Sequence, residues 1–239
     1  MIDVTKLLDP YERKARLYPA LICLLPITIA VFVSFPEVYS TFSGLIALVV
    51  TFGGLQFLSH LARDRGKLLE NRLFNDWGGI PSVTIFRHRD SVIPKLTKLG
   101  YHSTLSNKTG IAGPSEEIEK NDPATADEIY RSWSDHLRTH TRDETKFSLL
   151  FKENINYGFR RNLLGIKLYC LVSGLIGLGV IILPHPSHLS NTDVSTCIAI
   201  IIYISTVIFV VNGNWVKVMA DEYAKRLVEA VYLVHKIAG

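Results

Sequence analysis

Four long apolar stretches, none with a charged residue in its interior, restrict the fold of this chain more than any other feature. They form two pairs, one on each side of a long polar block. Each stretch is about as long as an α-helix must be to cross roughly 30 Å of hydrocarbon. The helices of a soluble enzyme need a polar face, whereas these stretches are apolar on every side. The pattern predicts an integral membrane protein with four spans, at residues 17–35, 44–61, 165–183 and 194–211.

Basic residues predict the orientation of these spans. Lys and Arg flank the spans on the side of the two termini and the polar block, whereas the short loops 36–43 and 184–193 contain none. The positive-inside rule therefore places both termini and the polar block in the cytoplasm. The first span is too long for a typical signal peptide and lacks a clear cleavage site, so we expect it to be retained. The three cysteines lie within the spans and are expected to be free thiols.

Helical periodicity continues from the spans into the polar regions. Apolar residues at helical spacing follow the second span as far as Phe74, and they follow the fourth span through the C-terminal segment. A similar stripe begins near Lys146 and runs without proline into the third span. We expect one continuous helix there, bent at most near Gly158 or Gly165.

The polar block predicts a mainly helical domain. Its expected elements are a short strand at 83–86, a short helix at 91–99, a surface loop at 108–122 and a helix at 122–142. Asp122 and Pro123 are a typical cap and first-turn proline for that last helix. The fold class is an all-α membrane protein with room for a minor β element. It divides into a cytoplasmic N-terminal segment (1–16), spans one and two (17–61), a cytoplasmic ligand-sensing domain (62–164), spans three and four (165–211) and a cytoplasmic C-terminal amphipathic helix (212–239).

Local basic and aromatic residues are the candidates for a ligand site in the cytoplasmic domain. Residues 62–163 carry 17 Lys and Arg against 14 Asp and Glu, so any anion site must be local. One basic cluster follows Trp77, and another lies at the end of the helix that starts at Asp122. Basic side chains hold phosphates and aromatic rings stack on bases, the combination that binds single-stranded nucleic acid or nucleotides. The candidate ligand-binding residues are Trp77, Arg87, His88, Arg89, Tyr101, Arg138, Arg142 and Lys146.

The alternative is that these basic residues only pair with acidic neighbours and face solvent or the membrane surface. The available carboxylates are Asp90, Asp135, Asp143 and Glu144. Composition slightly favours this alternative. Trp133 lies at helical spacing from other apolar residues, so we expect it in a hydrophobic core and not on a stacking surface.

Mildly polar residues in the spans are candidates for a water-filled path between subunits. The candidate pore-lining residues are Thr51, Gln56, Ser205, Thr206 and Asn212. For each residue taken alone, a hydrogen bond between helices is the favoured alternative. Small residues on the third span, including Ser173 and Gly177, predict close helix packing. Four helices per chain make a poor pore, so a channel requires an oligomer.

The sequence offers little for enzyme, metal or cofactor chemistry. The spans lack central ionisable residues, which argues against a pump, a protease or an ion-coupled transporter. His136 and His140 have helical i, i+4 spacing but no further Cys or His partners nearby. We therefore expect no catalytic residue, no metal and no cofactor. A membrane-tethered hydrolase that uses His88 or Asp90 is a weaker alternative.

Four short motifs, taken with the arrangement of two pairs of spans, carry a resemblance to a known family. They lie at residues 75–81, 122–127, 141–143 and 153–162. The chain resembles the membrane effectors of the Hailong anti-phage defence system. The resemblance implies a homotetrameric ion channel in the bacterial inner membrane, encoded alongside a nucleotidyltransferase. It further implies that single-stranded oligodeoxyadenylate made by that partner holds the channel closed, and that loss of this DNA opens it. The ligand-binding residues above rest on their chemistry alone.

Two functional hypotheses follow. The first is an oligomeric channel gated by a nucleotide or an oligonucleotide, because charge-free spans are joined to local basic and aromatic clusters. The second is a membrane scaffold or anchor whose cytoplasmic domain recruits a protein partner. In that case the basic residues next to the spans would serve only anionic lipid headgroups.

Overall fold

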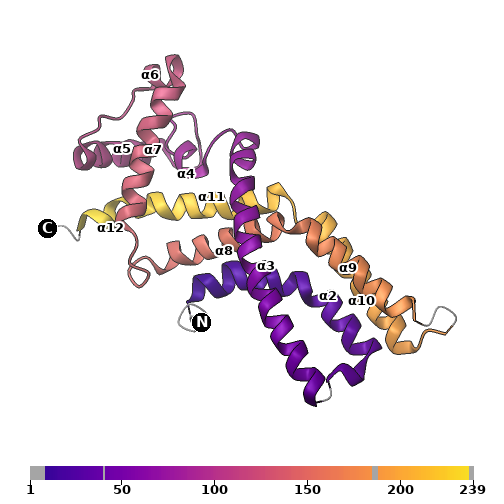
Figure 1. Cartoon of the computed structure of the whole chain (residues 1–239). Helices are drawn as coiled ribbons and strands as arrows, with labels where there is room; N and C mark the ends of the chain where they lie inside the picture. Colours follow the sequence, from indigo (N-terminus) through magenta and orange to yellow (C-terminus); the bar gives the residue numbers. More distant parts are fainter. Residues whose placement is uncertain (1–8, 40, 185–187, 237–239) are drawn as a thin grey trace. The chain divides into compact units, whose positions relative to one another are not determined.

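The computed structural model describes residues 9–39, 41–184 and 188–236, and the side chains of these residues except 38–52, 235 and 236. Within these ranges every regular element is a helix and there is no strand (Figure 1). The helices are η1 (Glu12–Leu17), α2 (Tyr18–Ser34), η2 (Pro36–Tyr39), α3 (Thr41–Asp76), α4 (Pro81–Thr84), α5 (Lys95–Thr109), α6 (Glu116–Asn121), α7 (Pro123–His140), α8 (Ser148–Gly165), α9 (Lys167–Ile182), α10 (Asn191–Phe209), α11 (Gly213–Glu229) and α12 (Val231–Lys236).

The chain forms two compact units, each built from two separate stretches of sequence. The apolar unit comprises Met1–Glu70 and Gly158–Val216, and the polar unit comprises Asn71–Tyr157 and Lys217–Gly239. This division separates the four predicted spans from most of the predicted cytoplasmic domain. The boundaries between the units fall inside α3, α8 and α11.

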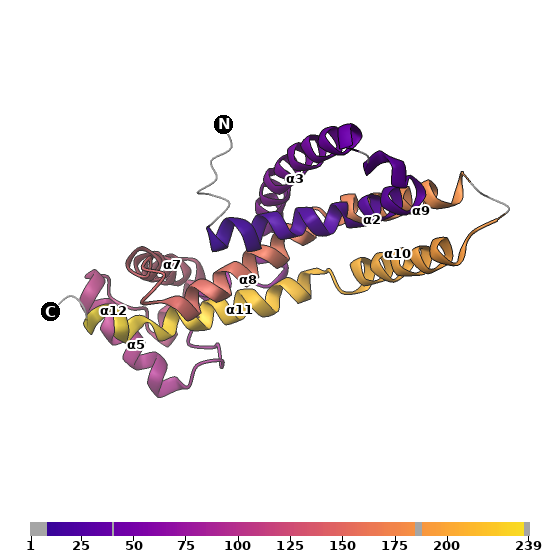
Figure 2. The ribbon, with the colours of Figure 1, turned by 90° about the horizontal axis from the view of Figure 1, so that it is seen from below.

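In the apolar unit, α2, α9 and α10 pack against one another (Figure 2). Small residues on α9 allow this close packing, as the sequence predicts. A Cβ atom added at Gly177 would lie 3.0 Å from the carbonyl oxygen of Pro26, and one added at Gly174 would lie 2.6 Å from Ile204. The outward faces of the three helices carry mostly exposed apolar side chains, such as Leu175. An apolar exterior of this kind suits lipid better than water.

Among the described residues, two helices are long and apolar enough to cross a membrane: Glu12–Ser34 and Asn191–Phe209. They correspond to the first and fourth predicted spans. The third predicted span corresponds to α9, which is bent by 60° against α8, and the pair counts as one further candidate if it is taken as a single broken span. The second predicted span lies within α3, where the side chains of 44–52 are outside the described part. The total of four spans stays a prediction.

Several sequence predictions about helix ends are confirmed. The Asp122 side chain caps α7, because its Oδ1 accepts a hydrogen bond of 3.1 Å from the backbone N–H of Thr125. The helix that begins near Lys146 does bend at Gly165, where Ile166 interrupts it before α9. The helix of the second predicted span continues beyond the apolar stretch, as predicted, because α3 runs without a break to Asp76.

Other local predictions are wrong. Residues 83–86 form no strand: Val83 belongs to the short helix α4, which starts at Pro81, and Ile85 and Phe86 follow in turns. The expected loop 108–122 contains α6, whose N-cap Ser115 accepts a hydrogen bond of 3.2 Å from Ile118. The helix expected at 91–99 starts only at Lys95, because the backbone of Pro94 is extended, with ψ of 139°. Finally, α7 ends at His140 and not near Arg142.

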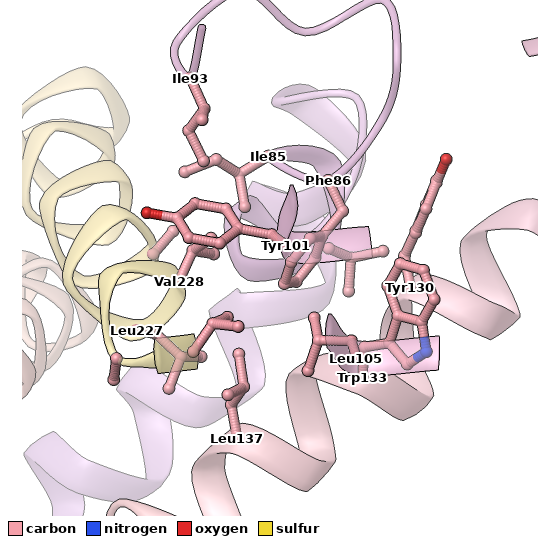
Figure 3. Packing of buried hydrophobic residues seen from close by; sticks show 14 of the residues in the cluster. Ile85, Phe86, Ile93, Tyr101, Leu105, Tyr130, Trp133, Leu137, Leu227 and Val228 are labelled. Atoms are coloured by element: carbon pink, nitrogen blue, oxygen red, sulfur yellow. The ribbon is translucent and has the colours of Figure 1, made fainter. Parts of the chain in front are cut away.

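The polar unit has a hydrophobic core to which α4, α5, α7, the first part of α8, α11 and α12 contribute. Figure 3 shows Leu227 and Val228 packed across this core from Tyr130 and Trp133. Trp133 is fully buried, which confirms its predicted place in a core. Its ring lies 5.9 Å from that of Phe86 in an edge-on arrangement, measured between ring centroids. The same core fixes the backbone that carries the candidate ligand-binding residues.

Candidate functional site

The turn from Arg87 to Asp90 carries three of the predicted ligand-binding residues. The Lys98 side chain binds the backbone of this turn. The Lys98 Nζ donates hydrogen bonds of 2.6 and 2.5 Å to the carbonyl oxygens of Arg87 and Asp90. The Asp90 N–H also donates to the Arg87 carbonyl, at 3.1 Å. Lys98 is only 2% exposed, and burial lowers the pKa of its amine. Because a buried ammonium group binds two of its carbonyl oxygens, the backbone of this turn is held in one conformation.

Arg87 is already bound within the fold. Its Nε and Nη2 donate to the two carboxylate oxygens of Asp127 at 2.8 and 2.5 Å, and its Nη1 donates to the Gly78 carbonyl at 3.0 Å. The hydrogen bond with Asp127 raises the pKa of the guanidinium further. Arg87 therefore joins the N-terminal part of α7 to the turn after α3. Its charge is used within the fold and is not free for a ligand.

The turn after α3 needs its glycines. Gly78 and Gly79 have φ of 79° and 138°, in the region that other residues rarely adopt. A Cβ at Gly79 would lie 2.6 Å from Thr84 Cγ2 and 3.0 Å from Arg87 Nη2. This turn presents Trp77 as a half-buried ring whose centroid lies 5.9 Å from that of Phe74. The Trp77 side chain is therefore partly accessible to a ligand.

His88 points into the fold and not toward a ligand. Its backbone N–H donates to the buried carboxylate of Glu119 at 2.7 Å, and its ring Nε2–H donates to the Pro114 carbonyl at 2.9 Å. Glu119 also accepts a hydrogen bond of 2.8 Å from the Tyr130 hydroxyl. The His88 ring lies 4.9 Å from the ring of His102. These contacts give His88 a structural role.

His102 is the titratable centre of this buried network. Its Nε2–H donates to the Phe86 carbonyl at 2.9 Å. Burial lowers its pKa to about 4, and the charges of His88 and Lys98 act in the same direction, while the bond to Phe86 opposes the change. Glu119, the nearby carboxylate, is paired with Tyr130. The neutral imidazole is therefore the form that the fold holds at neutral pH.

Acid should destabilise the polar unit through His102. Between about pH 6.5 and pH 4 this imidazole is protonated in the unfolded chain but not in the folded chain. The unfolded state therefore binds more protons, and the free energy of unfolding decreases as the pH is lowered. We expect a loss of about 3 kcal/mol over this range. Urea unfolding of the solubilised protein at pH 7 and pH 4, followed by tryptophan fluorescence, measures it. H102Q should lose most of this pH dependence, whereas H140Q, on the exposed end of α7, should keep it.

Tyr101 is buried, so its ring is not available to stack on a ligand. The ring centroid lies 5.1 Å from that of Tyr232 on α12. Burial raises the pKa of its hydroxyl. Tyr101 belongs to the hydrophobic core, at the place where α5 packs against α12.

The second basic cluster lies on the surface at the end of α7. Arg138 donates to Asp135 at 2.6 Å, and the Lys146 amine lies 3.8 Å from the Asp143 carboxylate. Arg138 therefore pairs with an acidic neighbour, as the alternative interpretation of the sequence predicts. All three basic side chains of this cluster are exposed, Arg142 included. Exposed ion pairs contribute little stability, so a phosphate can replace these carboxylates.

The two clusters are held at opposite ends of α7. Arg87 is paired with Asp127, the fifth residue of α7, whereas Arg138 lies in the last turn of that helix. A helical rise of about 1.5 Å per residue separates Asp127 from Arg138 by roughly 16 Å. Among the eight predicted residues, the exposed cations are Arg89, Arg138, Arg142 and Lys146. A ligand that uses both clusters must be an extended chain and not a single nucleotide.

Sequence reasoning missed the buried supports of this site. Lys98, Glu119 and His102 are all at least nine-tenths buried. A signal for Lys98 does exist, because it precedes Tyr101 and Leu105 by three and seven residues, on the same face of a helix. Glu119 lies in a short acidic helix and carries no comparable signal.

The predicted pore-lining residues lie in the apolar unit, and the four whose side chains the structure describes make local hydrogen bonds. Ser205 and Thr206 donate to carbonyls four residues earlier in α10, at 2.8 and 2.9 Å. Asn212 caps α11, because its Oδ1 accepts from the Trp215 N–H at 3.0 Å. Gln56 is exposed and lies 3.1 Å from the His60 ring nitrogen. The side chain of Thr51 lies outside the described residues.

A buried polar junction connects three segments of the apolar unit. The Asn162 amide donates to the Ala15 carbonyl at 2.7 Å, and its oxygen accepts from Arg161. Arg161 in turn pairs with Glu70 on α3. Asn162 is fully buried, and a Cβ at Gly66 would lie 2.5 Å from its amide oxygen. The start of the first span, α3 and α8 therefore meet at one hydrogen-bonded point.

The chain was compared with protein-family models, with curated proteins and with solved structures. No family model, no curated protein and no solved structure matches it.

Proposed function

We propose that this chain is one subunit of an oligomeric ion channel that a nucleotide or an oligonucleotide gates from the cytoplasm. One observation carries the proposal: the boundaries between the apolar and polar units fall inside three helices, α3, α8 and α11. A ligand that changes the polar unit can act on the spans through these helices, provided that it binds one state of the channel more tightly than another.

The chemistry of the exposed cations supports a phosphate-rich, extended ligand. Arg89 lies on the turn that Lys98 supports, near the start of α7, while Arg138 lies about 16 Å along α7 from Asp127, by the helical rise, and Arg142 follows just after the helix ends. Guanidinium groups bind phosphate with two parallel hydrogen bonds, and the half-buried ring of Trp77 can stack on a base. These features fit a short single strand of nucleic acid.

The resemblance to Hailong effectors makes the proposal more specific. In this form the ligand is single-stranded oligodeoxyadenylate made by a nucleotidyltransferase encoded alongside. It holds a homotetramer closed in the bacterial inner membrane, and its loss during phage infection opens the channel. The exposed polar side chains of Gln56 and Thr206 would then face neighbouring subunits or the pore.

Planar-bilayer recording of the purified protein tests the proposal. We expect current in the absence of ligand and its suppression by oligodeoxyadenylate. Absence of current under both conditions would contradict the channel.

Ligand affinity should depend on particular arginines. We expect R89E and R142E each to weaken oligodeoxyadenylate binding about fivefold or more, because each removes a phosphate contact and adds a repelling charge. The matched control is R72E, which changes an exposed arginine of the polar unit outside both clusters. Calorimetric titration at two salt concentrations measures the affinity and its salt dependence. An equal loss in all three variants would mean that only net charge matters.

A scaffold that recruits a protein partner is the competing function. The pairing of Arg87 with Asp127 and of Arg138 with Asp135 favours it, because these arginines already have partners. Equal, weak binding of any polyanion, together with no conductance, would support the scaffold instead of the channel.

A further inference from the structure

A cavity of about 440 Å³ lies in the apolar unit, where α3 passes the junction of α8 and α9. Two basic residues, Arg65 and Lys167, line it together with apolar side chains, among them Leu68, Leu164, Leu168 and Leu171. None of these residues belongs to the ligand site of the polar unit. The cavity thus combines two cations with an apolar wall at one end of a candidate span.

The walls of this cavity are fixed by close backbone contacts. A Cβ at Gly165 would lie 2.5 Å from the backbone nitrogen of Gly66, so α8 and α3 touch there without side chains between them. Ile166 then breaks the helix, and α9 leaves at 60° to α8. The Lys167 amine donates to the carbonyls of Ile208 and Val211 at 2.9 and 2.8 Å, which ties the start of α9 to the end of α10.

Both cations keep hydrogen-bonding capacity. A lysine amine has three N–H donors, and Lys167 uses two of them on carbonyls. Arg65 is exposed, and within the described part of the chain its guanidinium has no hydrogen bond or ion pair. Arg65 can therefore bind a phosphate with two parallel hydrogen bonds, and Lys167 can add a third.

The apolar wall is unusually exposed for leucine. Leu68 and Leu168 are 74% and 70% exposed, and both line the cavity beside the two cations. A small hydrophilic anion would leave these leucines in contact with water. An amphiphile with a phosphate head and long hydrocarbon chains would cover them and pair with both cations at once.

We infer that this cavity binds one anionic phospholipid of the surrounding bilayer, with its phosphate on Arg65 and Lys167 and its acyl chains along Leu68, Leu168 and Leu171. The bound lipid contacts residues on both sides of the break between α8 and α9, and it contacts α3 as well. The inference requires a bilayer around the apolar unit and is independent of conductance and of nucleotide binding.

Native mass spectrometry of the intact, detergent-solubilised protein tests the headgroup. Phosphatidylglycerol should bind at one tight site, and phosphatidylcholine should bind there at least fivefold more weakly. R65Q should weaken phosphatidylglycerol binding about fivefold, as expected for one basic contact near the surface. The matched control is K67Q. It also removes one positive charge, but Lys67 lies two residues after Arg65 and does not line the cavity. Equal losses in both variants, or equal binding of the two lipids, would overturn the site.

The acyl chains and the source of the phosphate need separate tests. L168S should weaken phosphatidylglycerol binding several-fold. L175S should not, because Leu175 is also largely exposed on α9 but lies outside the cavity. Inorganic phosphate at millimolar concentration should fail to displace the lipid. Displacement by phosphate, or no difference between the two serine variants, would show that acyl chains do not occupy the cavity. Unchanged thermal unfolding of all four variants in detergent would confirm that each one folds.

Discussion

G165A should destabilise the apolar unit by about 3 kcal/mol or more, even though alanine is the better helix former. The added Cβ would lie 2.5 Å from the Gly66 nitrogen, 2.8 Å from the Arg65 carbonyl carbon and 2.9 Å from the Gly66 Cα. All three are backbone atoms of α3, so the contact cannot be relieved by a change of side-chain rotamer. The two helices must move apart, and the junction around Asn162 opens with them.

Thermal unfolding in detergent gives the measurement for this variant. A loss of about 3 kcal/mol in a chain of this size corresponds to a fall in Tm of roughly 6 to 12 °C. The matched control is G179A on α9, where an added Cβ would approach only Leu183 Cδ1, at 3.8 Å. That control should leave Tm unchanged or raise it slightly. If G165A behaved like G179A, the close contact between α3 and α8 would be wrong.

K98M should cost the polar unit about 4 kcal/mol and weaken ligand binding as well. It removes two hydrogen bonds from a charged donor to the carbonyls of Arg87 and Asp90, at 2.6 and 2.5 Å, and it leaves both acceptors next to an apolar side chain. Each such bond contributes about 2 kcal/mol. Because the turn then loses its support, Arg89 is no longer held in one position toward a ligand.

Urea unfolding and oligodeoxyadenylate titration of the same preparation separate the two effects. The matched control is K95M, which removes an exposed lysine one turn earlier on α5 that pairs with Glu116 at 2.5 Å. An exposed pair is worth less than about 1 kcal/mol, so K95M should change stability little. Wild-type stability in K98M would show that the buried amine does not support the turn.

The parts of the fold that follow from local chemistry could be predicted from the sequence. The cap at Asp122, the bend at Gly165 and the burial of Trp133 could each be recognised from residues a few positions apart in the sequence. The apolar stretches were recognisable for the same reason, since the helical period and the thickness of a bilayer set their pattern.

The parts that depend on distant partners could not be predicted. Val83 and its neighbours form an apolar run too short to separate a strand from a buried helical turn, and the contact with α7 decides in favour of α4. Arg87 was expected to bind a ligand or to pair with Asp90, but its partner, Asp127, lies forty residues away. Only the folded chain could show that this cation is already engaged.

The hydroxyls of Ser205 and Thr206 bond to their own helix, and this has a consequence for assembly. Each donates to a carbonyl of α10, so its proton already has an acceptor within the protomer and needs none on a neighbouring subunit. A lone protomer can therefore persist in lipid without an unmet hydrogen-bond donor at these two positions. Association of protomers through this face would therefore depend on van der Waals packing and on the release of lipid.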